Sequence, residues 1–282
     1  AGADSLRDLF AYRLARPSLE LRRPFGWAGG ASLRAGLGRK WTHGSALGAY
    51  QERWGEAEWH HFGSGRRQYE LRARTESRRY LRARTVIPSY DEARLEAAAT
   101  IPLERRFRLH VAPKLFRAAF AADDSLVYRD HVSGELLVRL ESGLRDWRGG
   151  TPAGEDSLLD PPDWLVRAGA RLGWLRNERV READHASASF VAGCAREALG
   201  GFWLDLSGEV GRRDYRRSSG TGTLVFEGLQ ISIAGTDYTF VSLSLVGQAD
   251  LGRKLRLEAF GLYDRELHRA AADDFSLWAF TM

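Results

Sequence analysis

An alternation of apolar and polar residues with a period of two constrains this chain most strongly, because it recurs along much of its 282 residues. The clearest stretch spans residues 163–176, where alternate positions carry Trp164, Val166, Ala168, Ala170, Leu172 and Trp174. The positions between them carry Leu165, Arg167, Gly169, Arg171 and Gly173. A helix would scatter these residues around its surface, whereas a strand separates them into two faces. The pattern therefore predicts long β-strands with one apolar face.

The spacing of two tryptophans in this stretch indicates what the apolar face contacts. Trp164 and Trp174 lie ten residues apart on one face, which is about 33 Å along a strand. With a tilt of about 40°, the projection is about 25 Å, which is the height of the apolar band of an outer-membrane barrel. Soluble sandwich strands are usually shorter. We therefore expect an all-β, transmembrane, antiparallel up-and-down β-barrel, with Trp27, Trp164, Trp174 and Tyr263 in its lipid-interface girdles.

Charged side chains opposite the apolar stripes suit a barrel with a wet interior. In residues 202–210, for example, Asp205 and Glu209 alternate with leucine and valine. The side chains that we expect to line the lumen are Arg34, Arg139, Glu141, Arg167, Arg171, Asp205, Glu209, Arg256 and Glu258. These charges allow two interpretations. The arginines either make the interior attractive to anions, or they pair with the acidic residues in a network that fills it.

The average composition does not look like that of a helical membrane protein. The mean hydropathy is −0.38, and no stretch approaches the roughly 18 to 20 consecutive apolar residues that a spanning helix needs. A closed barrel is the other fold that satisfies every backbone polar group inside lipid. The formal charge is +5, but basic residues alternate with apolar ones instead of forming one run, which argues against a nucleic-acid partner.

Turn signals divide the chain into about 14 strands, with 12 as the main alternative, and residues 1–282 are interpreted as one barrel domain. Long and short loops should alternate in such a barrel. This alternation fails between the long segment 211–222 and the short turn 234–237, which indicates a misplaced or split strand there.

The last residues, Asp274 to Met282, form an aromatic-rich strand that resembles the terminal strand of bacterial outer-membrane β-barrel proteins, a porin-like class. The resemblance is to the class and not to a specific family, and Met282 replaces the phenylalanine with which such strands usually end. It implies closure of the barrel by this strand and recognition by the barrel-assembly machinery. The chain opens on Ala1-Gly2-Ala3-Asp4, so we expect a mature chain from which a signal peptide has been removed.

Few residues indicate chemistry. The single cysteine, Cys194, excludes an intrachain disulfide and a cysteine-based zinc site. His60 and His61 are neighbours in a predicted strand and would point to opposite faces, so one metal ion could not easily bind both. Asp184-His185-Ala186-Ser187 allows a hydrolase at the membrane rim, although the companion motifs are not evident. The basic segment 212–217 is either a solvated loop or a contact for lipopolysaccharide or a protein partner, and Ser218 to Gly222 reads as a hairpin turn.

These observations predict a non-enzymatic outer-membrane barrel without cofactor or metal. It would act as a channel or as the membrane-embedded anchor subunit of an envelope-spanning assembly. The expected partners are outer-membrane lipid and lipopolysaccharide, the barrel-assembly machinery, and periplasmic or envelope-complex subunits, with no nucleic acid. The alternatives are a rim hydrolase acting on lipid or peptide, and a soluble β-barrel ligand-binding protein.

Overall fold

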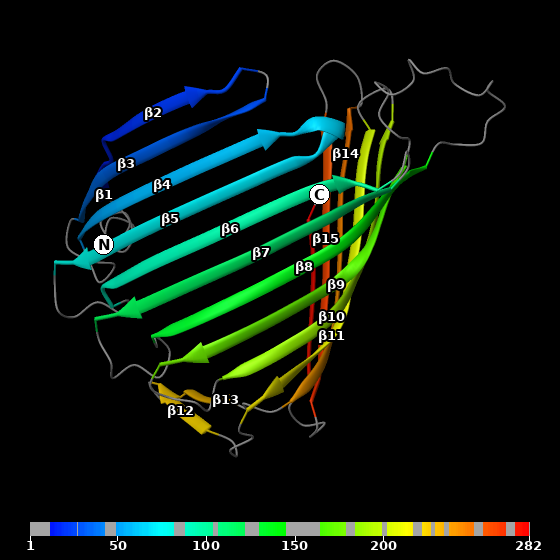
Figure 1. Ribbon diagram of the computed structural model, residues 1–282. Coiled ribbons are helices and arrows are strands. Elements are labelled where there is room, and N and C mark those ends of the chain that lie inside the picture. The colour runs from blue at the N-terminus through cyan, green and yellow to red at the C-terminus, as the bar shows by residue number, and fades with distance from the viewer. Residues whose placement is uncertain are drawn as a thin grey trace, which may run out of the picture. The chain divides into compact units, whose positions relative to one another are not determined.

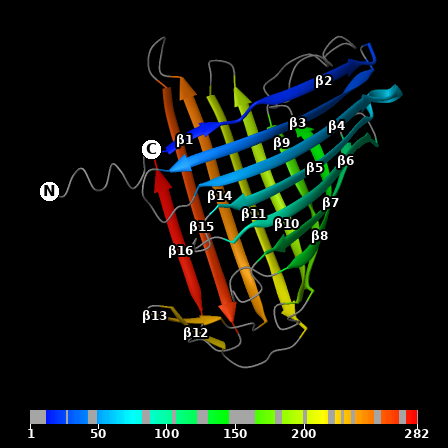
Figure 2. The ribbon, with the colours of Figure 1, turned by 90° about the vertical axis from the view of Figure 1, so that its left-hand side faces the viewer.

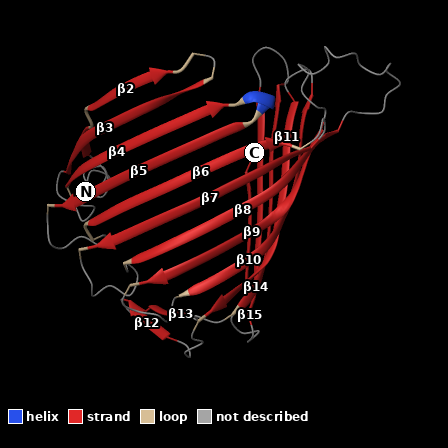
Figure 3. Ribbon diagram, in the orientation of Figure 1, coloured by secondary structure: helices blue, strands red, loops and turns tan. Residues whose placement is uncertain are grey.

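A computed structural model describes residues 12–26, 28–42, 49–81, 88–103, 107–121, 130–144, 164–178, 184–198, 202–216, 222–226, 229–233, 237–250, 256–268 and 274–281. The strands are β1 (Tyr12–Ala15), β2 (Ser18–Pro24), β3 (Gly29–Thr42), β4 (Tyr50–Phe62), β5 (Gln68–Tyr80), β6 (Tyr90–Pro102), β7 (Phe107–Phe120), β8 (His131–Leu144), β9 (Trp164–Asn177), β10 (His185–Ala198), β11 (Phe202–Tyr215), β12 (Gly222–Phe226), β13 (Leu229–Ile233), β14 (Tyr238–Asp250), β15 (Arg256–His268) and β16 (Phe275–Thr281). A 3₁₀ turn, Ser64–Arg66, is the only helical element among the described residues (Figure 3).

Fourteen of these strands form one antiparallel up-and-down sheet, which confirms the all-β, up-and-down part of the predicted fold and the prediction of about 14 strands. Apart from β1 and β2, the strands follow one another in chain order from β3 to β11 and continue through β14, β15 and β16 (Figures 1 and 2). Strands β3 to β11 are 13 or 14 residues long, as the alternation predicts. The sheet is not closed, because no pairing between described residues joins β16 to another strand than β15.

Two details explain why sequence patterns miscounted the strands locally. Strands β12 and β13 pair only with each other, and β11 pairs directly with β14 from Phe202↔Ala249 to Arg213↔Tyr238. Residues 216–237 are therefore one long connection, and this corrects the strand that was misplaced there. At the other end of the sheet, β1 and β2 pair with successive parts of β3. Pro17 lies between β1 and β2 and lacks a backbone N–H, which interrupts the strand pairing there. Strands β1 and β2 therefore occupy one strand position beside β3.

The connections fall into two groups by length. Segments 25–28, 63–67, 103–106, 199–201 and 251–255 join strands at what we call the short-turn end. The segment 145–163 also joins strands at this end but is long. Segments 43–49, 81–89, 121–130, 178–184, 216–237 and 269–274 join strands at the opposite, long-loop end. With β12 and β13 removed from the wall, loop length alternates along the chain apart from 145–163.

The described chain divides into two compact units. Unit 1 comprises Ala1–Ala99, Pro113–Gly134 and Leu175–Asp184, and unit 2 comprises Thr100–Ala112, Glu135–Trp174 and His185–Met282. Strands β6 to β9 contribute residues to both units. The interpretation of residues 1–282 as one domain stays a prediction.

The sheet has an apolar face that no protein layer covers among the described residues. In unit 1 this face carries Leu33 and Leu37, whose exposed fractions are 53% and 59%. In unit 2 it carries Trp278 and Phe280, at 75% and 62%. The buried apolar side chains of the described residues are few: Ala112, Ala118 and Tyr238. Exposed apolar surface on this scale is uncommon on monomeric soluble proteins. No helix among the described residues is long and apolar enough to cross a membrane.

Candidate functional site: the polar face of the sheet

The other face of the sheet is here called the polar face. In unit 1 its charges alternate from strand to strand, with glutamates on β4 and arginines on β3 and β5. On β4, Glu52, Glu56 and Glu58 occupy alternate positions, so their side chains share this face. The register places Arg34 of β3 opposite Glu56, and Arg72, Arg74 and Arg78 of β5 opposite the three glutamates. Opposite charges on neighbouring strands stabilise the pairing of those strands.

Ion pairs join these strands side by side. Arg34 Nη2 lies 2.9 Å from Glu58 Oε2, and Arg72 Nε lies 2.7 Å from Glu56 Oε1. Arg72 also reaches Glu58, at 2.5 Å from Nη2 to Oε1. These bridges link three consecutive strands through their side chains as well as through their backbones.

Two carboxylates of this network are buried. Glu52 receives Arg16 Nε at 2.7 Å and Arg78 Nη2 at 3.1 Å. Glu76 receives Arg74 Nη2, Arg78 Nη2 and the hydroxyl of Tyr90, at 2.9, 2.9 and 2.8 Å. Gly38 faces Glu52, and a Cβ at Gly38 would collide with the glutamate side chain. Burial of an ionised carboxylate is tolerated only where cations and donors surround it, so this part of the face is built around its charges.

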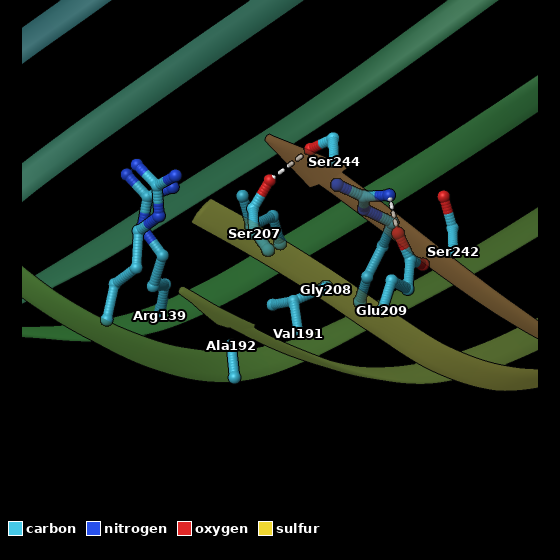
Figure 4. Close-up of a pocket in the computed structure, with 11 residues that line it drawn as sticks. Arg139, Val191, Ala192, Ser207, Gly208, Glu209, Ser242 and Ser244 are labelled. Atoms are coloured by element: carbon cyan, nitrogen blue, oxygen red, sulfur yellow. Dashed lines mark hydrogen bonds and ion pairs between the residues drawn. The ribbon is translucent and has the colours of Figure 1, made fainter. Parts of the chain in front are cut away.

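In unit 2 the polar face has a second set of pairs around a small hollow (Figure 4). Arg167 pairs with Asp205, and Arg171 pairs with Glu209. Arg139 Nη2 lies 2.5 Å from Glu141 Oε1. The hollow has a volume of about 270 Å³ and is lined by Leu137, Arg139, Arg167, Arg171, Val191, Ala192, Ser207, Gly208, Glu209, Ser242 and Ser244. Small residues on β10, β11 and β14 leave this space open beside the arginines.

The structure thus brings together most of the residues that the sequence predicted to line a lumen. Arg139, Glu141, Arg167, Arg171, Asp205 and Glu209 share the polar face of unit 2, and Arg34 lies on the polar face of unit 1. Arg256 and Glu258 lie at the short-turn start of β15 and are exposed. Arg34, Arg139, Arg167 and Arg171 each face a carboxylate, which fits the interpretation of a paired network. That this face lines a lumen stays a prediction.

The predicted girdle residues lie on the apolar face where they are described. The guanidinium carbon of Arg196 lies 5.0 Å from the ring centre of Trp164, and Trp174 is 43% exposed. Tyr263 packs on Trp278 with ring centres 4.1 Å apart. Trp27 lies outside the described residues.

Sequence reasoning missed a repeated element at the long-loop end. In five connections, the last residue of one strand donates its backbone N–H to an aspartate or serine side chain just before the next strand. The donor and acceptor residues are Tyr80 and Ser89 (2.9 Å), Phe120 and Asp130 (2.6 Å), Asn177 and Asp184 (2.6 Å), Tyr215 and Asp237 (2.8 Å), and His268 and Asp274 (2.8 Å). The sequence signal was present: in each case the capping residue directly precedes tyrosine, histidine or phenylalanine.

Aromatic residues at the long-loop end pack on one another across the strands. In unit 1, Tyr50 contacts Tyr80, with ring centres 5.7 Å apart, and Phe120 contacts Tyr90 and His131. In unit 2, the chain of contacts runs through His185, Tyr215, Tyr238 and His268. These rows give each long-loop end an ordered rim of aromatic rings on the polar face.

The motifs that suggested chemistry have structural roles at opposite ends of the strands: Asp184 and His185 lie at the long-loop end, and His60 and His61 lie at the short-turn end. Asp184 is buried and caps Asn177, and His185 packs on Tyr215 with ring centres 5.2 Å apart. His60 and His61 point to opposite faces: His60 contacts Phe62, whereas His61 stacks between Trp59 and Tyr69. No group of three or more potential metal ligands occurs among the described residues.

Removal of one cap provides a direct test of this element. We expect Asp184→Ala to lower the free energy of unfolding by about 1–3 kcal/mol, because it leaves a buried backbone N–H without its acceptor. Asp184→Asn keeps an acceptor oxygen and should cost less. Urea unfolding followed by tryptophan fluorescence would measure both, and equal losses in the two variants would contradict the capping role.

The sequence matches no protein-family model and no curated protein.

Proposed function

We propose that this chain is a non-enzymatic β-barrel of a bacterial outer membrane that acts as a channel for small polar solutes. The observation that carries the proposal is the contrast between the two faces of the sheet. One face exposes large apolar side chains along strands of 13 or 14 residues, and the other carries paired charges. An outer-membrane barrel requires this arrangement, because one face meets lipid and the other meets water.

The strand directions favour a wall of twelve strands in the closed barrel. A wall that is antiparallel throughout needs an even number of positions. Strands β3 to β11 supply nine positions and β14 to β16 supply three, so these elements give 9 + 3 = 12. The position shared by β1 and β2 would make thirteen. We therefore propose a closed wall of twelve strands, the twelve-strand alternative, from which β1 and β2, paired with β3 in the structure, would be excluded.

The polar face of unit 2 supports a channel. Its hollow is lined by serine, glycine and alanine beside three arginines, each of which has a carboxylate partner. Walls of this kind offer hydrogen bonds without a strong net charge. We therefore propose a pore with low preference between anions and cations.

A second candidate function is favoured by unit 1. Its polar face holds a dense ion-pair network with two buried carboxylates, which would stiffen and fill an interior. Such a barrel would serve as the membrane-embedded anchor of an envelope assembly. In either role, the aromatic-rich β16 is the segment that we propose the barrel-assembly machinery recognises.

Electrical recording separates the two roles. The full chain, refolded in detergent, should fractionate as a membrane protein, should show heat-modifiable migration on a gel and should conduct ions in planar bilayers. Ser244→Trp should reduce the conductance, because Ser244 lines the hollow, whereas Leu245→Trp on the opposite face should not. A protein that inserts into the bilayer but conducts no ions would favour the role of a membrane-embedded anchor. A chain that stays monodisperse in plain buffer would overturn both roles and favour the soluble ligand-binding alternative.

A further inference from the structure

The apolar face of unit 1 carries an arginine at the long-loop end of each strand that finishes there. The strands are β3, β5, β7 and β9, and the residues are Arg39, Arg79, Arg117 and Arg176. Each lies one or three residues before the last residue of its strand, so each points away from the polar face. All four side chains are exposed. We call these residues, together with Arg53 near the start of β4, the arginine belt.

Several members of the belt have no carboxylate partner in the part of the chain that the structure describes. Arg79 pairs with Asp91 at 2.6 Å, and Arg117 pairs with Glu178 at 3.1 Å. By contrast, Arg39, Arg53 and Arg176 have no carboxylate partner among the described residues, and Arg39 instead lies over the ring of Trp41. Three exposed guanidinium groups at one level of an otherwise apolar face are available to an external anion.

The same face at the short-turn end has a different composition. In unit 1 it carries Trp59 and Tyr69, and in unit 2 it carries Phe107, Trp164, Phe202 and Phe280. Arg196 is present there, but it lies over the ring of Trp164. Unit 2 repeats the arginines at the long-loop end, with Arg212 on β11 and Arg265 on β15. The long-loop end of the apolar face is therefore the one richer in arginine, beside Trp41 and Trp174, whereas the short-turn end is mainly aromatic, with Arg23 and Arg196 among the rings.

We propose that the arginine belt binds the phosphate groups of the lipid leaflet at the long-loop end, which in an outer membrane are those of lipopolysaccharide. This inference rests on the proposed function, since it requires the apolar face to lie in a membrane. A guanidinium group binds a phosphate through two parallel hydrogen bonds. Long arginine side chains also extend along an apolar surface to reach headgroups. Aromatic residues suit the interface of the opposite leaflet.

The proposal also orients the protein. Extracellular loops of outer-membrane barrels are long and periplasmic turns are short. The belt lies at the long-loop end, where the outer leaflet would be, and the last strand ends at the short-turn end. The charge of the belt and the loop lengths therefore agree on the side that faces outward.

Binding of fluorescent lipid A to the refolded full chain in zwitterionic detergent tests the belt. The variant R39Q/R53Q/R176Q removes three charges that pair with no carboxylate of the described residues. Because each basic residue near an anionic lipid surface contributes about 1 kcal/mol, we expect a loss of affinity of about a hundred-fold. The matched control R23Q/R67Q/R196Q removes three arginines at the short-turn end and should bind like the wild type. R39K/R53K/R176K keeps the charges, and its affinity for lipid A should lie between those of the wild type and the glutamine variant R39Q/R53Q/R176Q.

Further arms identify the chemical group and separate the two proposals. Dephosphorylated lipid A should bind the wild type as weakly as lipid A binds the belt variant, and inorganic phosphate should compete poorly because it lacks acyl chains. If the protein is heat-modifiable and inserts into phosphatidylcholine vesicles, but the wild type and the belt variant bind lipid A equally, the proposal of phosphate binding by the belt is wrong. The proposal of a membrane barrel would still stand. A wild type that fails to insert into any vesicle would instead overturn the barrel.

Discussion

Replacement of Leu243 by arginine should lower the free energy of unfolding from a bilayer by about 2–4 kcal/mol, because a cation at mid-depth of the lipid-facing surface is expensive. Leu243 lies in the middle of β14, opposite Gly208 and Tyr263, and is 46% exposed on the apolar face. The measurement is urea unfolding of the protein in lipid vesicles, followed by tryptophan fluorescence. The size of this loss distinguishes a lipid-facing Leu243 from a water-facing one. An arginine in place of a water-exposed leucine would cost little and would improve solubility.

The control for depth lies on the same strand and the same face. Thr239 is exposed near the long-loop end of β14, four residues before Leu243. Thr239→Arg should change the free energy of unfolding by less than about 1 kcal/mol, because the cost of a cation falls toward the interface. Equal effects at the two positions would argue against a membrane-embedded face.

Substitution of Glu52 by glutamine should have the second large effect, a loss of about 3 kcal/mol in the free energy of unfolding. The glutamate is buried between Arg16 and Arg78, and neutralising it leaves both guanidinium groups without their shared counter-charge. Breaking a buried ion pair by removing one partner commonly costs about 3–5 kcal/mol. The lower end applies here because Arg78 keeps Glu76 at 2.9 Å and Arg16 is partly exposed.

An exposed pair on the same face serves as the comparison. Glu20 and Arg22 lie 2.7 Å apart, and the Arg22 side chain is 73% exposed. Glu20→Gln should cost much less than Glu52→Gln, because exposed ion pairs contribute little to stability. Failure of Glu52→Gln to exceed Glu20→Gln would contradict the structural role of the buried network.

The local element types could be predicted from the chain because a two-residue period reports directly on which face a side chain occupies. Residues 163–176 predicted a long strand with tryptophan at both ends, and β9 spans Trp164–Asn177. His60 and His61 were expected on opposite faces, and their contacts confirm it. The grouping of Arg139, Arg167 and Asp205 on one face follows from the same parity.

Alternation could not distinguish a strand of the wall from a strand in a loop. Residues 222–226 and 229–233 have the local character of strands, yet they pair only with each other. The five caps at the long-loop end were also missed, because each joins residues that lie six to 22 positions apart and become neighbours only when the hairpin forms.

By itself, the sequence determined the strands, their two faces and the sign of the charge at each position, since these follow from side-chain order along an extended backbone. Only the tertiary structure decided which strands are neighbours, and therefore that Glu52 meets Arg78 and that Arg171 meets Glu209. The physical reason is that pairing register depends on backbone hydrogen bonds between distant segments, and a strand's own side-chain pattern does not specify its partner.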